Sequence, residues 1–348
     1  MSAAEPHPMM GPACRQAGLP REEARRSPSM KAIRVHEYGD ESVLRYEDVP
    51  DPQPAPRRLV IKVAAASINR GDLSRRQGTY GGGLTALPFT PGWEVAGTVE
   101  ALGEGVEGLS VGDRVIAQMG DGGYAEKALV HQAGLYQMPE GMSFEEGCTI
   151  PVVFLTAWFA LHRLCRLQAN ETALIQAGGS GVGIAAIQIA RLTGARVVTT
   201  AGSDEKCARC LELGADHAIN YRAKDFVQEV NRITEAAGAD VVLESVGGEV
   251  FEKSLAAMGR YGRLCMVGNS SGQPNSVDPR ALMFKNLSVS GFYLGAEIAA
   301  GAAGPAMEEL LRLFQQNKLR TVVDRVFPLT EAAAAHRYVG ERRNFGKV

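Results

Sequence analysis

A glycine-rich segment in the middle of the chain has the residue types needed to bind a phosphate. It runs Ala177-Gly178-Gly179-Ser180-Gly181-Val182-Gly183 and is a variant of G-x-G-x-x-G, with Ser180 in place of the middle glycine. Glycines allow a tight turn and a close approach of backbone to a pyrophosphate, and a following helix N-terminus adds free N–H groups. An apolar strand pattern (172–177) precedes the segment and an apolar helix pattern (182–192) follows it. The segment therefore predicts a dinucleotide-binding turn.

The next strand pattern indicates which dinucleotide is bound. Sites for NAD usually place Asp or Glu at the end of this strand, where the carboxylate accepts from the ribose 2′-hydroxyl. Here the strand 196–200 runs into Ala201, Gly202 and Ser203, with no acid at that position. Ser203 and Lys206 are placed to contact a 2′-phosphate, although Lys206 could also be a solvated helix residue. The missing carboxylate favours NADPH over NADH.

Strands and helices alternate around this turn. Further strands are expected at 218–221, 240–243, 262–267 and 287–290, with helices at 204–213 and 305–316. This alternation is typical of an α/β fold, a Rossmann-type doubly wound parallel sheet with helices on both faces. We assign residues 151–295 to this dinucleotide-binding domain.

The flanking segments have a different pattern. Residues 30–150 are rich in short strand patterns, such as 31–35 and 59–63, separated by Gly and Pro. They form a β-rich domain, which residues 296–348 rejoin. Residues 1–29 are rich in Pro and Arg without apolar periodicity, and we expect a disordered leader there.

Composition excludes several classes of function. The formal net charge is −2 and no dense basic run occurs in the body of the chain, so no nucleic-acid partner is expected. No apolar run reaches the roughly 20 residues that cross a bilayer, since Pro151 and Thr156 interrupt the longest one, so no membrane partner is expected. Cys207 and Cys210 form a C-x-x-C inside a helical pattern without a second pair, which favours reduced thiols and a cytoplasmic protein.

Several motifs in the same order resemble a known superfamily. They are Ser67-Ile68-Asn69-Arg70-Gly71-Asp72, Pro91-Gly92-Trp93-Glu94-Val95-Ala96-Gly97, Val111-Gly112-Asp113-Arg114-Val115, Thr156-Ala157-Trp158, the Ala177–Gly183 turn, and Leu213-Gly214-Ala215-Asp216. Residues 30–348 resemble the medium-chain dehydrogenase/reductase superfamily, and within it the zinc-free quinone oxidoreductases related to zeta-crystallin. The resemblance implies that the β-rich domain is a GroES-like catalytic domain. It also implies a final strand soon after Gly346-Lys347, and the end at Val348 predicts that this strand is short.

The same comparison argues against a catalytic metal. Zinc-dependent members have a Cys, a His and a second Cys at positions that Asn69, Trp93 and Val152 occupy here, and none of these completes a tetrahedral zinc site. Without a metal to polarise a carbonyl group, oxidation of simple alcohols is disfavoured. We therefore expect hydride transfer from NADPH to a quinone or a conjugated enone, for which positioning is most of the catalysis.

The resemblance implies that three residues line the reaction site. Tyr80 has a phenol that could donate to a developing enolate or quinol oxygen, or it could simply pack beneath the turn at 81–83. Asn69 would contact both cofactor and acceptor, whereas Asp72 is expected to orient other groups rather than to act as an acid.

The remaining cofactor contacts also come from the resemblance, supported by the rule that doubly wound sheets bind ligands beyond the carboxyl ends of their strands. Beyond the turn residues, they are Thr156, Tyr221, Ser245, Val246, Gly268, Asn269, Ser270, Phe292, Tyr293, Leu294 and Asn344.

Two other functions are compatible with the same motifs, and the sequence also predicts a second copy of the chain as a partner. An enoyl or 2-alkenal reductase would use the same machinery on a carbon–carbon double bond, and a non-catalytic NADPH-binding structural or regulatory protein would use only the cofactor site. The strand pattern 287–290 closes the β–α series and leaves an unpaired edge, so a homodimer through this edge is expected.

Overall fold

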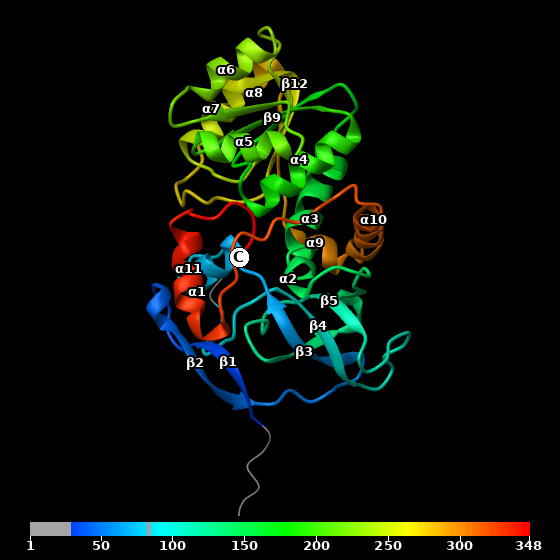
Figure 1. Cartoon of the computed structure of the whole chain (residues 1–348). Helices are drawn as coiled ribbons and strands as arrows, with labels where there is room; N and C mark the ends of the chain where they lie inside the picture. The colour runs from blue at the N-terminus through cyan, green and yellow to red at the C-terminus, as the bar shows by residue number, and fades with distance from the viewer. Residues whose placement is uncertain (1–28, 82–84) are drawn as a thin grey trace, which may run out of the picture.

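The parallel sheet forms the upper domain in Figure 1. The computed structural model describes residues 29–81 and 85–348. Six strands, all parallel, lie in the order β10-β9-β8-β11-β12-β13, the 3-2-1-4-5-6 order of a Rossmann sheet. They are β8 (Thr172–Ile175), β9 (Arg196–Ala201), β10 (His217–Asn220), β11 (Ala239–Glu244), β12 (Met258–Met266) and β13 (Ser288–Gly291).

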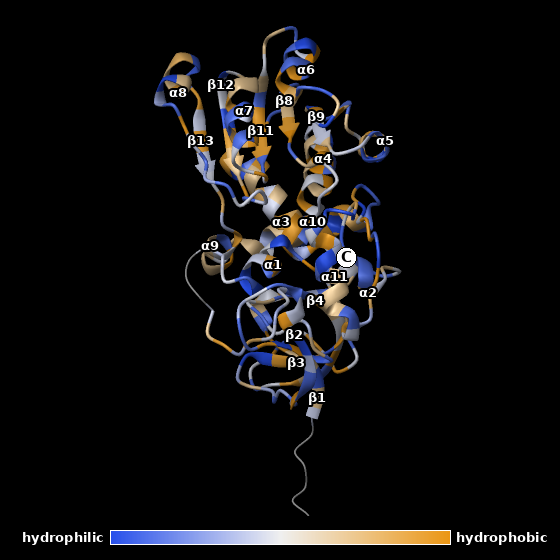
Figure 2. Cartoon of the chain, turned by 90° about the vertical axis from the view of Figure 1, so that its left-hand side faces the viewer, coloured by the Kyte–Doolittle hydropathy of each residue, from blue (hydrophilic) through white to orange (hydrophobic). Residues whose placement is uncertain are grey.

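Helices cover both faces of this sheet, and the apolar strands β8 and β11 lie between them (Figure 2). The helices are α4 (Gly181–Thr193), α5 (Asp204–Glu212), α6 (Phe226–Ile233), α7 (Glu249–Ala257) and α8 (Pro279–Lys285). Helix α4 begins where the Ser180 hydroxyl accepts from the Gly183 N–H at 3.0 Å, and it ends at Gly194, whose φ is +86°. These two caps place the start of α4 directly against the glycine-rich turn.

The second domain is built from antiparallel strands. Its five-stranded sheet has the order β6-β3-β4-β5-β7, and a separate pair of strands, β1 and β2, lies beside it. The strands are β1 (Ser29–Val35), β2 (Leu44–Pro50), β3 (Arg58–Ala66), β4 (Glu94–Leu102), β5 (Arg114–Gln118), β6 (Lys127–His131) and β7 (Leu135–Gln137), and helix α1 (Arg70–Arg76) follows β3. The side chains of β3, β4, β5 and β6 form its apolar core.

Helices between the two sheets join the domains into one hydrophobic cluster. They are α3 (Pro151–Trp158), the π-helix η3 (Phe159–Leu164), α9 (Leu294–Ala299) and α10 (Ala303–Gln315). The short helix α2 (Phe144–Gly147) packs instead against β3 and β4. The continuous helical stretch Phe144–Leu164 is long and apolar enough to span a bilayer. The sequence pattern predicts a shorter apolar run, interrupted at Pro151 and Thr156. Because 72% of its most apolar window is buried inside the protein, it has the environment of a core helix.

The chain returns to the antiparallel domain through helix α11 (Ala332–Gly340), which packs against α1. His336 lies in this contact and is buried. Arg76 Nη1 lies 3.3 Å from His336 Nδ1, and His336 Nε2 lies 3.3 Å from Tyr124 Oη. Because arginine only donates, Nδ1 must accept and Nε2 must carry the ring proton. Burial and the neighbouring Arg76 cation lower the pKa of His336 to about 3, so the ring is neutral.

The predicted α/β fold class, with a Rossmann sheet and a β-rich second domain, is confirmed. The largest difference in the parallel sheet is at β12, which begins at Met258 rather than 262. Strand β1 begins at Ser29, and the rest of the expected leader, residues 1–28, lies outside the described residues. The final strand is reduced to a single parallel bridge between Val323 and Lys347. The domain boundaries at 150 and 296 stay a prediction.

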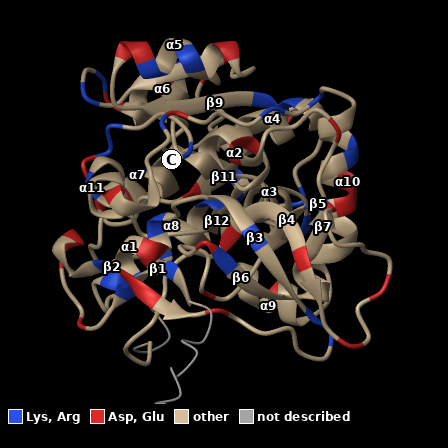
Figure 3. Ribbon diagram, turned by 60° about the horizontal axis from the view of Figure 1, so that its bottom comes forward, with Lys and Arg blue, Asp and Glu red and all other residues tan. Residues whose placement is uncertain are grey.

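Charges of both signs are interspersed over the ribbon in the view of Figure 3. All five described cysteines are free and buried, while Cys14 lies outside the described residues. Cys207 and Cys210 both lie on α5, as the helical pattern predicts.

The buried His336 should make stability depend on pH. In the unfolded chain this histidine has a pKa of about 6.5 and is protonated below that pH, whereas in the folded protein the ring stays neutral down to about pH 3. The free energy of unfolding should therefore fall as pH drops below about 6.5, by up to ~1.4 kcal/mol per pH unit from this residue. His336→Gln should flatten that slope in urea unfolding series between pH 6.5 and 4.5.

The exposed His217→Gln is the matched control. Asp72, whose pKa burial raises to about 6, acts in the opposite sense but is present in all three proteins, so the comparison isolates His336. Equal slopes for His336→Gln and His217→Gln would contradict the prediction.

Candidate functional site

One large cleft runs between the two domains. Its volume is about 2080 Å³, above the roughly 300–1,000 Å³ of a drug-sized pocket, so it has room for a dinucleotide and a second molecule. The glycine-rich turn lies on one side, and residues around α1 and Trp93 lie on the other. Most predicted site residues line it: Asn69, Tyr80, Thr156, Ser180, Gly181, Val182, Gly202, Ser203, Lys206, Tyr221, Ser245, Val246, Gly268, Asn269, Ser270, Phe292, Tyr293, Leu294 and Asn344. Asp72, Gly178 and Gly183 do not line it.

The glycine-rich turn has the geometry that a pyrophosphate requires. A Cβ at Gly178 would lie 2.2 Å from Thr199 Oγ1, and one at Gly183 would lie 2.3 Å from the Ala177 carbonyl oxygen. Both glycines are therefore needed for packing behind the turn, which explains why they lie outside the cleft lining. Gly181 and Val182 begin α4 at the cleft surface, where the helix N-terminus favours an anion. This cradle fits a dinucleotide.

The end of β9 provides polar groups but no carboxylate. Ser203 caps α5 by accepting from the Lys206 N–H at 3.2 Å. Lys206 Nζ donates to the carbonyl oxygens of Arg342, at 2.9 Å, and Asn344, at 2.8 Å. Desolvation lowers the pKa of this amine. Lys206 thus ties the C-terminal segment to α5 at the edge of the cleft.

Tyr221 and Arg222 lie over the backbone of Gly202. A Cβ built on Gly202 would be 2.9 Å from Tyr221 Oη and 3.6 Å from Arg222 Nε. Both residues line the cleft beside Ser203. Arg222 is a cation that the sequence analysis did not single out, although its position directly after Tyr221, at the carboxyl end of a strand, was a usable signal.

The loops after β11 and β12 meet beside the turn. The Ser270 N–H donates to the Ser245 carbonyl at 3.0 Å, which fixes these two loops to each other. Arg70 and Arg342 both donate to the Ser270 carbonyl, at 3.3 and 3.1 Å. Residues from three distant parts of the chain therefore close this side of the cleft.

Aromatic side chains form the far end of the cleft. The Tyr80 and Trp93 rings meet edge to face with centroids 5.2 Å apart. Burial, followed by the neighbouring Tyr293, raises the pKa of Tyr80 to about 12. Its phenol therefore keeps its proton at neutral pH. Part of the turn that could pack against Tyr80, residues 82–84, lies outside the described residues.

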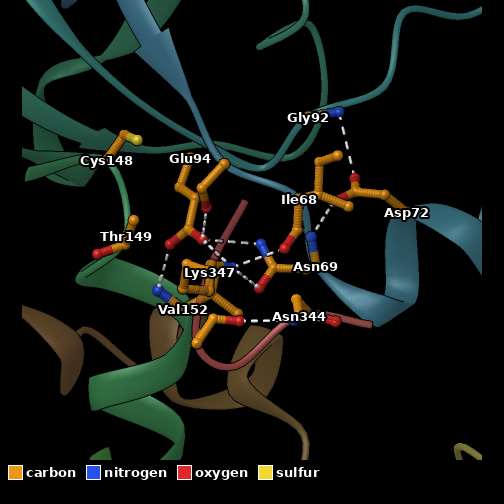
Figure 4. Close-up of polar contacts among 12 residues, drawn as sticks. Ile68, Asn69, Asp72, Gly92, Glu94, Cys148, Thr149, Val152, Asn344 and Lys347 are labelled. Carbon is orange, nitrogen blue, oxygen red and sulfur yellow. Dashed lines mark hydrogen bonds and ion pairs between the residues drawn. The ribbon is translucent and has the colours of Figure 1, made fainter. Parts of the chain in front are cut away.

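Asp72 lies behind this wall rather than in it. It is fully buried, and its carboxylate accepts from the Asn69 N–H at 2.8 Å and the Gly92 N–H at 3.2 Å (Figure 4). Desolvation raises its pKa to about 6, although these two hydrogen bonds oppose the shift. Asp72 thus holds the start of α1 and the loop before β4, which suits an orienting role.

A buried ion pair lies beside Asn69 (Figure 4). Glu94 at the start of β4 is fully buried, and Lys347 Nζ lies 3.0 Å from its Oε1. Glu94 also accepts from Asn69 Nδ2 at 2.8 Å, from the Val152 N–H at 2.7 Å and from the Ser67 hydroxyl. Neither Glu94 nor Lys347 was predicted from the sequence as a site residue. The available signal for Glu94 was that it is the single charge in the motif Pro91–Gly97.

Asn69, Trp93 and Val152 come together around Glu94 without forming a metal site. In the part of the chain that the structure describes, no group of three or more His, Cys, Asp or Glu side chains could hold a metal ion. Cys148 is near Glu94 in Figure 4, but its thiol is buried and its pKa is strongly raised by desolvation.

The fold and the cleft together define a two-domain dehydrogenase or reductase that binds a dinucleotide. Residues 55–140 match the alcohol dehydrogenase GroES-like domain, and residues 181–316 match the zinc-binding dehydrogenase domain. The chain is 35% identical to quinone oxidoreductase of Sus scrofa, over 88% of this chain and 93% of that protein. It therefore belongs to the medium-chain dehydrogenase/reductase superfamily, in its quinone oxidoreductase branch, which confirms the resemblance to the zeta-crystallin relatives.

Solved structures agree with this assignment. Escherichia coli quinone oxidoreductase complexed with NADPH has a TM-score of 0.85 and 30% identity, over 91% of this chain and 98% of that chain. An NAD-dependent alcohol dehydrogenase has the same TM-score and 34% identity, over 92% of this chain and 98% of that chain. The names of these two solved structures thus give different cofactors, NADPH and NAD. The cofactor of this chain therefore depends on its own residues at the end of β9.

The Trp93 ring packs directly against the backbone of Gly71 at the aromatic end of the cleft. A Cβ at Gly71 would lie 2.0 Å from Trp93 Cη2, so Gly71→Ala must displace the indole ring. Although alanine is favoured over glycine in a helix by about 1 kcal/mol, overpacking typically costs about 1–3 kcal/mol. We expect a net loss of stability and a shifted tryptophan emission, measured by thermal unfolding and fluorescence.

Gly81→Ala is the control, because no atom of the described residues lies within 4 Å of a Cβ built there. Adding Trp93→Leu to Gly71→Ala should relieve the clash and recover stability. If Gly71→Ala and Gly81→Ala unfold at the same temperature with the same emission, the pairing is wrong.

Proposed function

We propose that this enzyme transfers hydride from NADPH to a quinone or a similar conjugated carbonyl compound, without zinc. The observation that supports this most is the composition of the cleft. A dinucleotide turn faces a wall formed by Asn69, Tyr80 and Trp93, in which an amide and two aromatic rings occupy the reaction end. Such a wall fits a flat apolar acceptor. We also propose a cytoplasmic location, which the free cysteines support.

The groups near the end of β9 support NADPH as the cofactor. No carboxylate stands at the end of the strand, at Ala201 and Gly202, and Ser203, Tyr221 and Arg222 lie together at the cleft surface. A guanidinium group suits a phosphate, and a carboxylate at this place would repel one. Lys206 would add a second positive charge close to this group.

The residues of the chain would bind and orient the reactants. When bound, NADPH supplies a hydride, and the acceptor oxygen gains negative charge as the hydride arrives. Asn69 would position the reacting groups from the floor of the cleft, and the Tyr80 phenol, which holds its proton at neutral pH, would donate to the developing oxygen anion. Trp93 and Phe292 would exclude water from the two sides.

The acceptor range tests this proposal. A quinone spreads the incoming charge over a conjugated ring, whereas a saturated aldehyde develops a localised alkoxide that needs strong stabilisation. With NADPH, the enzyme should reduce ortho- or para-quinones far faster than saturated aldehydes, before and after treatment with a chelator. Turnover confined to enones would indicate the double-bond reductase instead. Efficient turnover of a saturated aldehyde would contradict the proposal.

Tyr80→Phe tests the proton donor separately. A general acid typically contributes 10²–10⁴-fold, so kcat should fall by at least about a hundredfold while the KM for NADPH changes little. The edge-to-face contact with Trp93 survives in the variant, because only the hydroxyl is removed. A packing role alone predicts an unchanged kcat, and that result would remove Tyr80 from the catalytic residues.

NADPH should bind more tightly than NADH, and Arg222→Ala and Lys206→Ala should each narrow the difference. A charge-assisted contact to phosphate contributes about 1.5–3 kcal/mol, which is roughly ten- to a hundredfold in affinity. Titration of intrinsic fluorescence with each cofactor gives the two constants. The exposed Lys318→Ala serves as the control, and equal affinities of the unmutated enzyme for both cofactors would refute the assignment.

A homodimer should form through the free edge at β13. Among the described strands β13 pairs only with β12, and the adjoining α8 leaves Met283 70% and Phe284 78% exposed. Phe284→Asp should shift sedimentation at micromolar concentration from dimer to monomer, whereas Val326→Asp, at another exposed apolar site, should not. A monomer in the unmutated protein would count against the dimer.

A further inference from the structure

We propose that Lys347 and Glu94 are positioning residues that fix the orientation of the Asn69 side-chain amide in the cleft. The inference rests on the proposed function, in which Asn69 contacts the reactants. Lys347 Nζ donates to Asn69 Oδ1 at 2.7 Å, and Asn69 Nδ2 donates to Glu94 Oε1 at 2.8 Å. The amide is therefore held at both ends by groups of opposite charge (Figure 4).

These two contacts allow only one orientation of the amide. An ammonium group can only donate hydrogen bonds, and an ionised carboxylate can only accept them. A flipped Asn69 would place its NH₂ group against Lys347 and its oxygen against Glu94, and both contacts would be repulsive in a buried site. Asn69 has two N–H bonds on Nδ2, and Glu94 takes one of them. The ion pair thus determines where the other N–H points, and Asn69 is a residue of the cleft lining.

Lys347 acts through Asn69 because its own donors are all used. Its three N–H groups are satisfied by the Ile68 carbonyl at 2.8 Å, Asn69 Oδ1 at 2.7 Å and Glu94 Oε1 at 3.0 Å. Its side chain is only 6% exposed. No N–H remains for a substrate, so the ammonium is not a proton donor in this reaction.

The backbone around Lys347 fixes the position of the ammonium group. Its alkyl chain packs against Gly181 at the start of α4, where a Cβ would lie 2.7 Å from Lys347 Cδ. The Gly346 N–H donates to the Gly179 carbonyl at 2.8 Å. The dinucleotide turn and the Asn69 amide are therefore positioned by the same short segment of chain.

The experiment uses the full-length enzyme and four variants. Lys347→Met alone leaves a buried, unpaired carboxylate and can fail to fold, so the informative protein is the double variant Lys347→Met/Glu94→Gln. Glu94 accepts from Asn69 Nδ2 with Oε1 and from the Val152 N–H with Oε2, so a glutamine there can keep only one of these two contacts. With its oxygen toward the Val152 N–H, its own NH₂ group faces Asn69, and nothing then prevents the Asn69 amide from flipping. Asn69→Ala and the triple variant complete the set, and Lys318→Met is an exposed control.

The double variant should regain a thermal midpoint within a few degrees of the parent while kcat stays about ten- to a hundredfold lower, the effect of one lost charge-assisted hydrogen bond. The KM for NADPH should change less than kcat. Adding Asn69→Ala should cause no further loss, because residues that act through one group are not additive. Lys318→Met should behave as the parent.

Three results would overturn the inference, and only the third would also contradict the proposed role of Asn69 in the reaction. Full recovery of kcat in the double variant would mean that the ion pair acts only on stability, with the role of Asn69 intact. A further, independent loss on adding Asn69→Ala would mean that Lys347 does not act through it. An unchanged kcat in Asn69→Ala itself would remove Asn69 from the proposed function and the inference with it.

Discussion

The buried ion pair between Glu94 and Lys347 is the interaction on which the cleft depends. The Glu94 carboxylate accepts hydrogen bonds from Ser67 after β3, from Asn69 at the start of α1 and from Val152 at the start of α3. The ammonium group belongs to Lys347 in the C-terminal segment. Removing one member of a buried pair typically costs about 3–5 kcal/mol, because the other charge is left without a partner. Neither residue can therefore change alone, and the four segments that they join are held in one arrangement.

The C-terminal segment connects this centre to the dinucleotide domain. Within a few residues, Gly346 bonds to the glycine-rich turn, Lys347 bonds to Val322, and the Val348 carbonyl accepts from the Ile68 N–H at 2.9 Å. The cleft lies between two domains, and such interfaces usually allow relative motion. Backbone hydrogen bonds from one strand-like segment to both sides reduce that freedom at the point where cofactor and acceptor would meet. Positioning, rather than a strong acid or a metal, is what this arrangement provides.

Local pattern was enough to predict the fold class, because each strand of the parallel sheet has a recognisable apolar pattern and the glycine-rich turn lies between a strand and a helix. Helices α6, α7 and α8 were not predicted. Local pattern also failed at β12, whose first residues include Gly259 and Gly262 and resemble a turn. The strand begins earlier because Met258 pairs with Ala239 of β11, and the pairing then shifts register and resumes at Arg263 opposite Val241. The site was harder to predict. Glu94 and Lys347 are separated by 253 positions, and no local signal shows that a lysine near the C-terminus is buried. Lys206 was found from its spacing, but its bonds to two backbone carbonyls depend on the tertiary fold.

The ion pair also explains why a lysine in this position does not replace a metal. A zinc ion has a vacant coordination position for a substrate oxygen, and its charge stabilises a localised alkoxide. Lys347 has no free N–H, and the adjacent Glu94 cancels its charge, so little positive potential remains for an oxygen anion in the cleft. A substrate that spreads its own charge over a conjugated system needs little from the protein beyond the neutral donors of an amide and a phenol. Under the proposed function, Asn69 and Tyr80 would supply those groups, and the ion pair that fixes the geometry of the cleft would also favour a quinone-like acceptor over a simple carbonyl.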